Sequence, residues 1–409
     1  MIKQILVLLS AVVICSCTSN TQENFIDPAD VLTDVLKLEH IIGGDQDPAE
    51  LDDDRFLLVR LRSAGFGVNE KNDVLLLDEN YVKVFDKNGR PKTIFGGSGQ
   101  GPGEFPVRAY NMWVGPTGFV SVYAVNYNQT AINFSPDFEY INKISFQENE
   151  EIKTIIGKYN IFDDRQKEIY PINDTDMLII IEADDRKDRS NITCYKSFIY
   201  KKGNKYSEIF TSENPGRVSA ESISMTNRDL GNIYVNPLDS KKVLIVNSLE
   251  DIHVENNKYS YVLTVMDIES NKKKTISHRY LPIVFEDYEP KRSQTVHPDP
   301  ETEKRLNDSY WEASKISSER MKKMKYKAPI INILTDNNYI FVFNQNTNEK
   351  EEILTDVFDA DTEKFLNSTY FSFMPAAIKN GFAYKYNWSS RNGFPSVEKF
   401  KIDPAVYGK

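Results

Sequence analysis

The stretch that most resembles a chemical motif is FGGSGQGPGEF, Phe95 to Phe105, whose glycines are typical of a loop that cradles a phosphate. A phosphate-binding P-loop ends in Lys followed by Ser or Thr, whereas here Gly103 is followed by Glu104 and Phe105. A dinucleotide fingerprint also needs a helix after the glycines, and the following VRAYNMWV is typical of a strand. The stretch is therefore predicted to be a structural connector, in which glycine supplies positive φ angles.

Few other side chains could bind a metal or act as a nucleophile. The four histidines are His40, His253, His278 and His297, and a zinc site would require three of them to converge. The acidic run LDDDR lacks the alternating oxygen ligands and the glycine of a calcium loop, so it is interpreted as a solvated turn. No metal and no cofactor are predicted.

Catalytic residues cannot be assigned from spacing. A nucleophile elbow is absent, and among 60 acidic residues spacing alone selects no pair for glycoside hydrolysis. Cys194 is predicted to be a core residue and has no cysteine partner for a disulfide once Cys17 is modified as described next. Whether the protein is an enzyme stays open, with a non-catalytic function favoured.

The N-terminus MIKQILVLLSAVVICSC has one cation, Lys3, followed by an apolar run that is too short for a mature transmembrane helix of about twenty residues. It predicts an export signal over residues 1–16. The segment ICSC resembles the lipobox of bacterial lipoproteins, which implies cleavage before Cys17 and lipidation of its sulfur. Residues 17–30 are then a flexible tether, and the lipid is the only predicted contact with the membrane. No acidic run follows Cys17, which favours an outer-membrane anchor that faces the periplasm.

The formal net charge is −10, and the chain has no dense basic block. Nucleic acid is therefore not a predicted partner.

Six short apolar runs end directly at an Asp or Asn, and most of them are 43 to 63 residues apart, near the length of a four-stranded propeller blade. The six residues are Asp78, Asn126, Asp184, Asn247, Asn344 and Asn387. A candidate inner strand precedes several of these runs, and a third strand with a polar turn follows them. After Asp403 too little chain remains for a last strand, so DVLTDVLKLE, Asp30 to Glu39, is predicted to close the ring. The fold class is thus all-β, a six-bladed β-propeller of four-stranded antiparallel blades over residues 31–409.

One interval is 97 residues long and contains a predicted helical insertion, residues 299–327, between blades four and five. Asp299 is its expected N-cap and Pro300 its first residue, while lysines enrich its last turn. Its expected apolar stripe consists of Leu306, Tyr310, Ala313 and Ile316. Packing on the rim is the favoured interpretation, and a lid or a partner surface stays open.

Loops that join second to third strands, and blade to blade, gather on one face of a propeller. That face would carry the ligand-binding candidates Arg108, Asn126, Tyr127, His253, Trp388 and Arg391. Aromatic planes with Arg and Asn suit carbohydrate or peptide recognition. The six Asp or Asn residues that end the apolar runs are expected to stabilise turns.

The segment from Phe95 to Ile141 resembles the NHL-type repeat, and GQGPGEF after VFDKNGRPKTI is similar to the six-bladed β-propeller lipoproteins of Bacteroidetes. The resemblance implies the fold and the anchoring. The zinc-binding histidines of NHL-type lyases are not matched. The resulting hypothesis is a monomeric, lipid-anchored envelope protein that binds a glycan, a peptide or a protein partner. A hydrolase or lyase of polysaccharides or lactones, and a scaffold in an envelope complex, are the alternatives.

Overall fold

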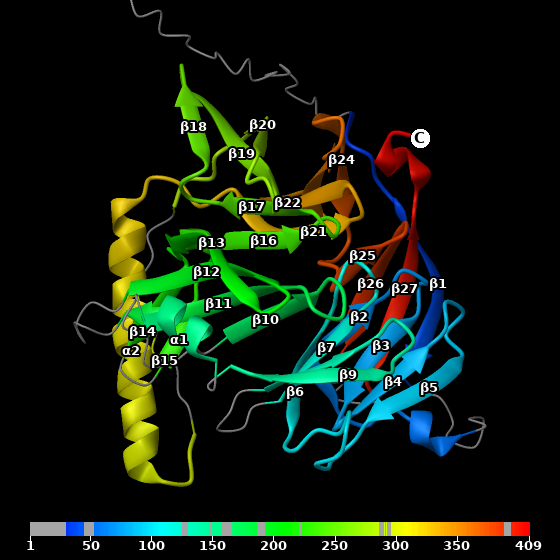
Figure 1. Ribbon diagram of the computed structural model, residues 1–409. Coiled ribbons are helices and arrows are strands. Elements are labelled where there is room, and N and C mark those ends of the chain that lie inside the picture. The colour runs from blue at the N-terminus through cyan, green and yellow to red at the C-terminus, as the bar shows by residue number, and fades with distance from the viewer. Residues whose placement is uncertain are drawn as a thin grey trace, which may run out of the picture.

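The computed structural model describes residues 30–44, 53–124, 130–146, 149–157, 166–185, 193–220, 223–285, 290, 292, 296–387 and 394–409. Most of these residues form groups of four antiparallel strands that follow one another along the chain and surround a common centre (Figure 1), and one parallel pair, Ala64 with Asn111, links the first two groups. This arrangement is that of a β-propeller. No helix within the described ranges has the length and the apolar composition needed to cross a bilayer.

We number the sheets in chain order, and in each the first strand of the chain segment lies nearest the centre. Sheet 1 contains β2 (Leu61–Val68), β3 (Val74–Asp78), β4 (Tyr81–Phe85) and β5 (Pro91–Gly96). Sheet 2 contains β6 (Ala109–Val114), β7 (Val120–Ala124), β8 (Thr130–Phe134) and β9 (Tyr140–Ser145). Sheet 3 contains β10 (Gln166–Pro171), β11 (Met177–Asp185), β12 (Thr193–Lys202) and β13 (Lys205–Glu213).

The second half of the chain repeats this order. Sheet 4 contains β16 (Ile233–Pro237), β17 (Lys242–Asn247), β19 (Lys258–Asp267) and β20 (Lys273–Tyr280), with the additional strand β18 (Ile252–Glu255) beside β19. Sheet 5 contains β21 (Ile330–Asp336), β22 (Tyr339–Thr347), β23 (Ile353–Asp359) and β24 (Lys364–Phe371). Sheet 6 contains β25 (Ala377–Lys379), β26 (Phe382–Asn387), β27 (Ser396–Ile402) and β1 (Leu36–Gly43).

The N-terminal strand β1 pairs antiparallel with β27, from Leu36 opposite Ile402 to Gly43 opposite Ser396. The expected strand, Asp30 to Glu39, therefore starts too early by six residues. Leu32 forms a bridge to Thr369 of β24 instead, and Asp34 turns the chain with a φ of 53° before β1 begins.

Apolar side chains pack between neighbouring sheets, which explains why the second strands are continuous apolar runs. All residues of β3 and β7 are buried, since each strand has a sheet on both sides. Separate clusters lie between sheets 1 and 2, 2 and 3, 3 and 4, 4 and 5, and 5 and 6. One further cluster contains Ile42, Leu76, Tyr384 and Val397, and so joins sheet 6 to sheet 1. The core is thus distributed around the centre.

The glycine-rich stretch connects β5 to β6, as predicted. Gly96 and Gly97 have φ angles of 85° and 111°, and the amide of Phe105 donates to the carbonyl of Gly97 at 2.7 Å. A Cβ atom on Gly96 would lie 2.5 Å from the fully buried ring of Phe105. Glycine is required here by both the backbone and the close contact.

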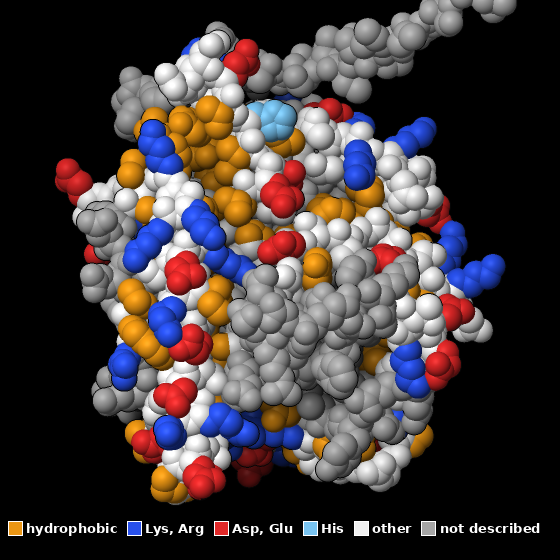
Figure 2. Space-filling view, turned by 90° about the vertical axis from the view of Figure 1, so that its left-hand side faces the viewer, with side chains coloured by type: hydrophobic (Ala, Val, Ile, Leu, Met, Phe, Trp, Pro, Cys, Tyr) orange, Lys and Arg blue, Asp and Glu red, His pale blue; other side chains and the backbone are white. Residues whose placement is uncertain are grey.

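Helix α2 (Pro300–Lys323) has the predicted N-cap, because the Asp299 side chain accepts from the amide of Thr302 at 3.0 Å. It stands along one side of the molecule and packs on the hairpin of β14 (Arg217–Ala220) and β15 (Ile223–Thr226) (Figure 1). Its exposed side carries cations and acids in alternation (Figure 2).

The expected apolar stripe of α2 is wrong in detail, because of its members only Ala313 is fully buried. The buried side instead contains Met321 and four serines, Ser309, Ser314, Ser317 and Ser318. These short side chains allow close approach to the hairpin segment, where Asn227 donates to Ser317 Oγ at 2.8 Å.

The described residues also contain elements that the sequence did not predict. Helix α1 (Glu150–Gly157) buries Ile152 and Ile155 between sheets 2 and 3. Three short 3-10 helices are η3 (Asp54–Phe56), η4 (Arg228–Leu230) and η5 (Pro404–Tyr407).

Candidate functional site

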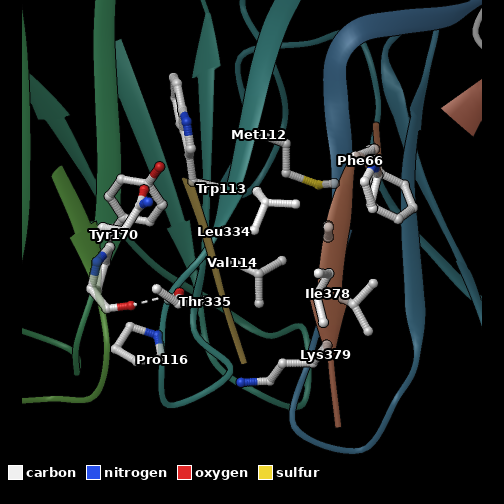
Figure 3. Close-up of a pocket in the computed structure, with 18 of the residues that line it drawn as sticks. Phe66, Met112, Trp113, Val114, Pro116, Tyr170, Leu334, Thr335, Ile378 and Lys379 are labelled. Carbon is white, nitrogen blue, oxygen red and sulfur yellow. Dashed lines mark hydrogen bonds between the residues drawn. The ribbon is translucent and has the colours of Figure 1, made fainter. Parts of the chain in front are cut away.

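A cavity of about 480 Å³ lies at the centre of the sheets, and the innermost strands β2, β6, β10, β16, β21 and β25 all line it (Figure 3). Residues that follow these strands, such as Pro116, Leu238 and Asn337, also line it. The cavity therefore reaches the turns between first and second strands, which we call the turn end.

Aromatic and apolar side chains form much of the lining. They are Phe66, Met112, Trp113, Val114, Tyr170, Leu334, Ile378 and Tyr386. In Figure 3, Trp113 and Tyr170 lie on one side of the cavity, and Phe66 and Ile378 lie on the other. Burial, followed by the charge of Glu168, raises the pKa of Tyr170 well above its ordinary value, and its hydroxyl donates to Glu168 Oε2 at 2.9 Å. Tyr170 is therefore a neutral aromatic surface at physiological pH.

Neutral polar groups are placed among these rings. The Asn236 amide donates to the carbonyl of Ile333 at 2.8 Å, and the Thr335 hydroxyl donates to the carbonyl of Pro237 at 3.2 Å. Asn332 contacts Met374 Sδ through its amide nitrogen at 3.4 Å. The side-chain oxygens of Asn236 and Asn332 accept no hydrogen bond from the residues that the structure describes, so both are free to accept from a ligand.

Lys379 carries the only charge among the lining residues that the structure describes. It is the last residue of β25, and its side chain extends toward the end of β21 (Figure 3). Its Nζ lies 2.5 Å from Glu70 Oε1 and donates to Asn337 Oδ1 at 3.4 Å.

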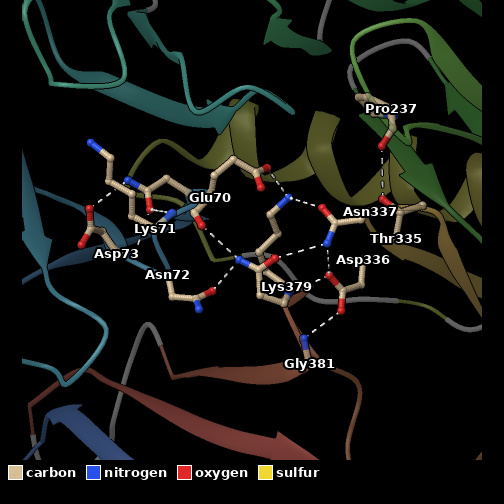
Figure 4. A network of polar contacts seen from close by, with 12 residues as sticks. Glu70, Lys71, Asn72, Asp73, Pro237, Thr335, Asp336, Asn337, Lys379 and Gly381 are labelled. Carbon is tan, nitrogen blue, oxygen red and sulfur yellow. Dashed lines mark hydrogen bonds and ion pairs between the residues drawn. The ribbon is translucent and has the colours of Figure 1, made fainter. Parts of the chain in front are cut away.

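A polar network holds three turns together around this lysine (Figure 4). Asn72, Asn337 and Asn380 each take a left-handed conformation with φ angles of 61°, 54° and 51°, which asparagine tolerates well. The Asn380 side chain donates to Asn72 Oδ1 at 2.9 Å. The buried Asp336 carboxylate accepts from the backbone amides of Asn380 at 2.6 Å and Gly381 at 2.8 Å. The turn end is thereby fixed before any ligand arrives.

The lining is suited to binding. It offers aromatic faces, amide groups and one ammonium, and its described residues include no carboxylate, histidine or cysteine that could pair as general acid and base. Likewise, the described residues contain no group of three or more His, Cys, Asp or Glu side chains that could hold a metal ion.

The two sequence-predicted candidates that the structure describes, Arg108 and His253, do not lie in this lining. Arg108 is exposed just before β6, with its guanidinium 5.8 Å from the centre of the Tyr110 ring, whereas the turn end lies at the opposite end of β6. His253 is exposed within β18, where the sequence analysis expected a loop. Asn126, Tyr127, Trp388, Arg391 and the lipidation candidate Cys17 lie outside the described residues. Ligand binding by these residues stays a prediction.

The other histidines and the free cysteine have separate environments. His40 lies within β1, directly after the predicted end of the closing strand at Glu39. His278 is buried in β20, and His297 precedes α2. Cys194 is buried, as expected of a core residue.

The residues that end the apolar runs have structural roles where their side chains are described. Asp78 accepts from the amide of Val59 at 3.0 Å and from Lys83 Nζ at 2.7 Å. Asn247 accepts from the amide of Leu249 at 3.2 Å. Asn344 and Asn387 donate to carboxylates of the neighbouring third strand, Asp356 at 2.8 Å and Glu398 at 2.9 Å. Of these side chains, only Asn247 bonds the backbone of its own turn as expected, whereas Asp78, Asn344 and Asn387 bond groups of other segments.

No family model matches the chain, and no curated protein matches its sequence. Among solved structures, a protein of Listeria monocytogenes is 9% identical, with 80% of this chain and 76% of that chain covered and a TM-score of 0.36. A Bacteroides fragilis protein thought to be exported is 11% identical, with coverages of 91% and 98% and a TM-score of 0.40. The acylaminoacyl peptidase of Pyrococcus horikoshii is 9% identical, with coverages of 80% and 43% and a TM-score of 0.37. At these identities the similarity concerns the fold alone.

Proposed function

We propose that this protein is a closed six-bladed β-propeller, anchored to the cell envelope through lipid on Cys17, that binds a glycan in its central cavity without catalysis. The pairing of β1 with β27 supports closure of the ring, since it places the first described strand in the last sheet. The apolar cluster between sheets 6 and 1 supports it as well, because it leaves neither of these sheets with an unpacked face.

The cavity lining is the observation that carries the proposal. Ligand pockets of about 300 to 1,000 Å³ are usually apolar and aromatic, with a few polar groups that fix orientation, and the cavity of about 480 Å³ has this composition. Sugar rings present apolar faces that pack on aromatic rings such as those of Trp113 and Tyr170, and hydroxyls that the side chains of Asn236 and Asn332 can bind. The absence of paired acids and bases in the described lining favours binding over hydrolysis.

The three tryptophans of the chain, Trp113, Trp311 and Trp388, provide the test. Trp113 lines the cavity, Trp388 is one of the ligand-binding candidates from the sequence, and Trp311 lies on α2 beside Arg292. The protein is first screened on an oligosaccharide array, and each Trp→Ala variant is then titrated calorimetrically with the best ligand.

We expect Trp113→Ala to weaken binding at least about tenfold, since an aromatic stacking partner contributes about 1.5 kcal/mol or more. Trp311→Ala serves as the matched control and should leave affinity unchanged. An unchanged affinity for Trp113→Ala, together with a loss of affinity for Trp388→Ala, would place the binding site away from Trp113 and contradict the proposal.

The anchor has its own test. Cys17→Ala should abolish incorporation of labelled palmitate and release the chain from the membrane fraction, because no other attachment is proposed. Normal labelling of this variant would refute lipidation at Cys17.

A further inference from the structure

We infer that the glycan bound in the cavity carries a single carboxylate, as a uronic acid does, and that Lys379 binds this group. The inference rests on the proposed glycan-binding function and adds the chemical class of the ligand.

The first argument is the incomplete hydrogen bonding of Lys379. An ammonium group has three N–H donors, and the described residues supply two acceptors, Glu70 Oε1 and Asn337 Oδ1. Lys379 nevertheless lines the cavity, and only 16% of its side chain is exposed. One N–H donor is therefore available to a ligand at a largely buried position, where a charge-assisted hydrogen bond is stronger than at an exposed one.

The second argument is that the turns are also connected by contacts that do not involve this ammonium. Asn380 connects to the neighbouring turn through its side chain, which donates to Asn72 Oδ1 at 2.9 Å and to the carbonyl of Glu70 at 3.2 Å. Its backbone amide is bound by Asp336. A neutral side chain at position 379 would lose the contacts with Glu70 and Asn337 but leave those of Asn380 in place, so the turns stay connected without the buried charge.

The charge distribution limits how acidic the ligand is. Lys379 is the only cation in the described lining, and the chain as a whole has a formal net charge of −10, which repels polyanions. One carboxylate placed at the turn end is compatible with both facts. A densely sulfated or phosphorylated glycan is not.

Glu70 competes with this carboxylate for the same ammonium. It does not line the cavity, and 40% of its side chain is exposed. Glu70→Gln keeps the shape of the side chain and removes its charge, so the ammonium of Lys379 is left for the ligand. This variant should therefore bind an acidic ligand more tightly than the wild type, a gain that a structural ion pair would not produce.

The experiment compares pairs of disaccharides that differ only in the oxidation of one C6, such as cellobiose and cellobiouronic acid, or galactobiose and the galactobiose derivative that has one galacturonic acid residue, so that each acid carries a single carboxylate. Calorimetry is performed on the full chain and on the variants Lys379→Met, Lys379→Arg and Glu70→Gln. For the pair that binds, we expect the wild type to prefer the acid about 10- to 100-fold, the range for a hydrogen bond to a charged group. Lys379→Met should abolish this preference and leave the neutral sugar unaffected, Lys379→Arg should keep part of it, and Glu70→Gln should increase it.

Lys385→Met is the matched control, because Lys385 lies in the same sheet and pairs with Glu398 at 3.5 Å but does not line the cavity. Lys385→Met should leave the preference for the acidic sugar over the neutral sugar unchanged. Equal affinity for acid and neutral sugars, or a preference that survives Lys379→Met, would overturn the inference while leaving the glycan-binding function intact. If no sugar of either kind binds, the proposed function itself fails and the inference fails with it.

Discussion

The Asp336 carboxylate provides a sharp test of how the turn end of the cavity is held. It is 2% exposed and accepts three short hydrogen bonds, from the amides of Asn380 and Gly381 and from the hydroxyl of Tyr407 at 2.8 Å. Burial and the charge of Asp336 raise the pKa of Tyr407, so this hydroxyl remains protonated and donates. One buried carboxylate thus joins a turn of sheet 5, a turn of sheet 6 and the C-terminal segment.

We expect Tyr407→Phe to lower the free energy of unfolding by about 1.5 to 3 kcal/mol, the contribution of a hydrogen bond to a charged group. The substitution keeps the ring contacts with Tyr339 and Phe341, whose centroids lie 4.8 and 5.6 Å away. Asp336→Ala should cost about 3 to 5 kcal/mol, since it leaves buried donors without an acceptor.

The double variant isolates the bond between the two residues. With the carboxylate already removed, Tyr407→Phe should cost less than about 0.5 kcal/mol, so the coupling energy of the cycle should be about 1 to 2.5 kcal/mol. Urea denaturation followed by circular dichroism measures all four proteins. If the costs of the two single substitutions add fully in the double variant, Tyr407 is not bound to Asp336 and the assignment of this network is wrong.

Further predictions concern the connector and the buried histidine. Gly96→Ala should lower the free energy of unfolding, measured by urea denaturation, by about 2 kcal/mol or more, because the new Cβ would lie 2.5 Å from the Phe105 ring at a residue with a positive φ. Gly203→Ala is the control: Gly203 has a φ of 58° but open space around it, so this variant should lose only about 1 kcal/mol. An equal loss of stability in the two variants would show that the close contact between residue 96 and Phe105 does not contribute to the effect. Burial lowers the pKa of His278 below its ordinary 6.5, so the unfolded state binds its proton first on acidification. The neutral, buried side chain of His278 therefore makes its full contribution to the free energy of unfolding above about pH 6.5, and this contribution is lost as the pH falls toward the pKa in the folded state. His278→Gln should flatten the decline of stability between pH 7 and 5, and an unchanged slope would contradict this.

The strands and the long helix could be predicted because their signals are local. Second strands with a sheet on both sides must be continuous apolar runs, and β3, β11, β17 and β26 all end within one residue of the predicted Asp or Asn. The N-cap Asp299 and the following Pro300 likewise set the start of α2 through contacts within one turn.

The missed elements depend on contacts distant in sequence. Helix α1 has only eight residues, and it is stabilised by burying Ile152 and Ile155 against two sheets. The buried serines of α2 could not be separated from exposed serines by periodicity, because the hairpin that covers them was not predicted.

The candidate site was missed for a similar reason. Its lining takes between one and a few residues from each of the six innermost strands, together with Tyr386 of β26, and no segment of the sequence contains more than a small part of it. The sequence did predict AYNMWV as an inner strand, so Trp113 could have been recognised as facing the centre. Lys379 gives no such signal, since its burial follows from the meeting of three turns.

The central claim is that a glycan binds in the central cavity, and a crystal structure of the chain with its best oligosaccharide ligand tests it most directly. The account predicts sugar density in the cavity, with a ring against Trp113 or Tyr170 and a carboxylate within hydrogen-bond distance of Lys379 Nζ. Density only at the opposite end of β6, near Arg108, with an empty cavity, would contradict it.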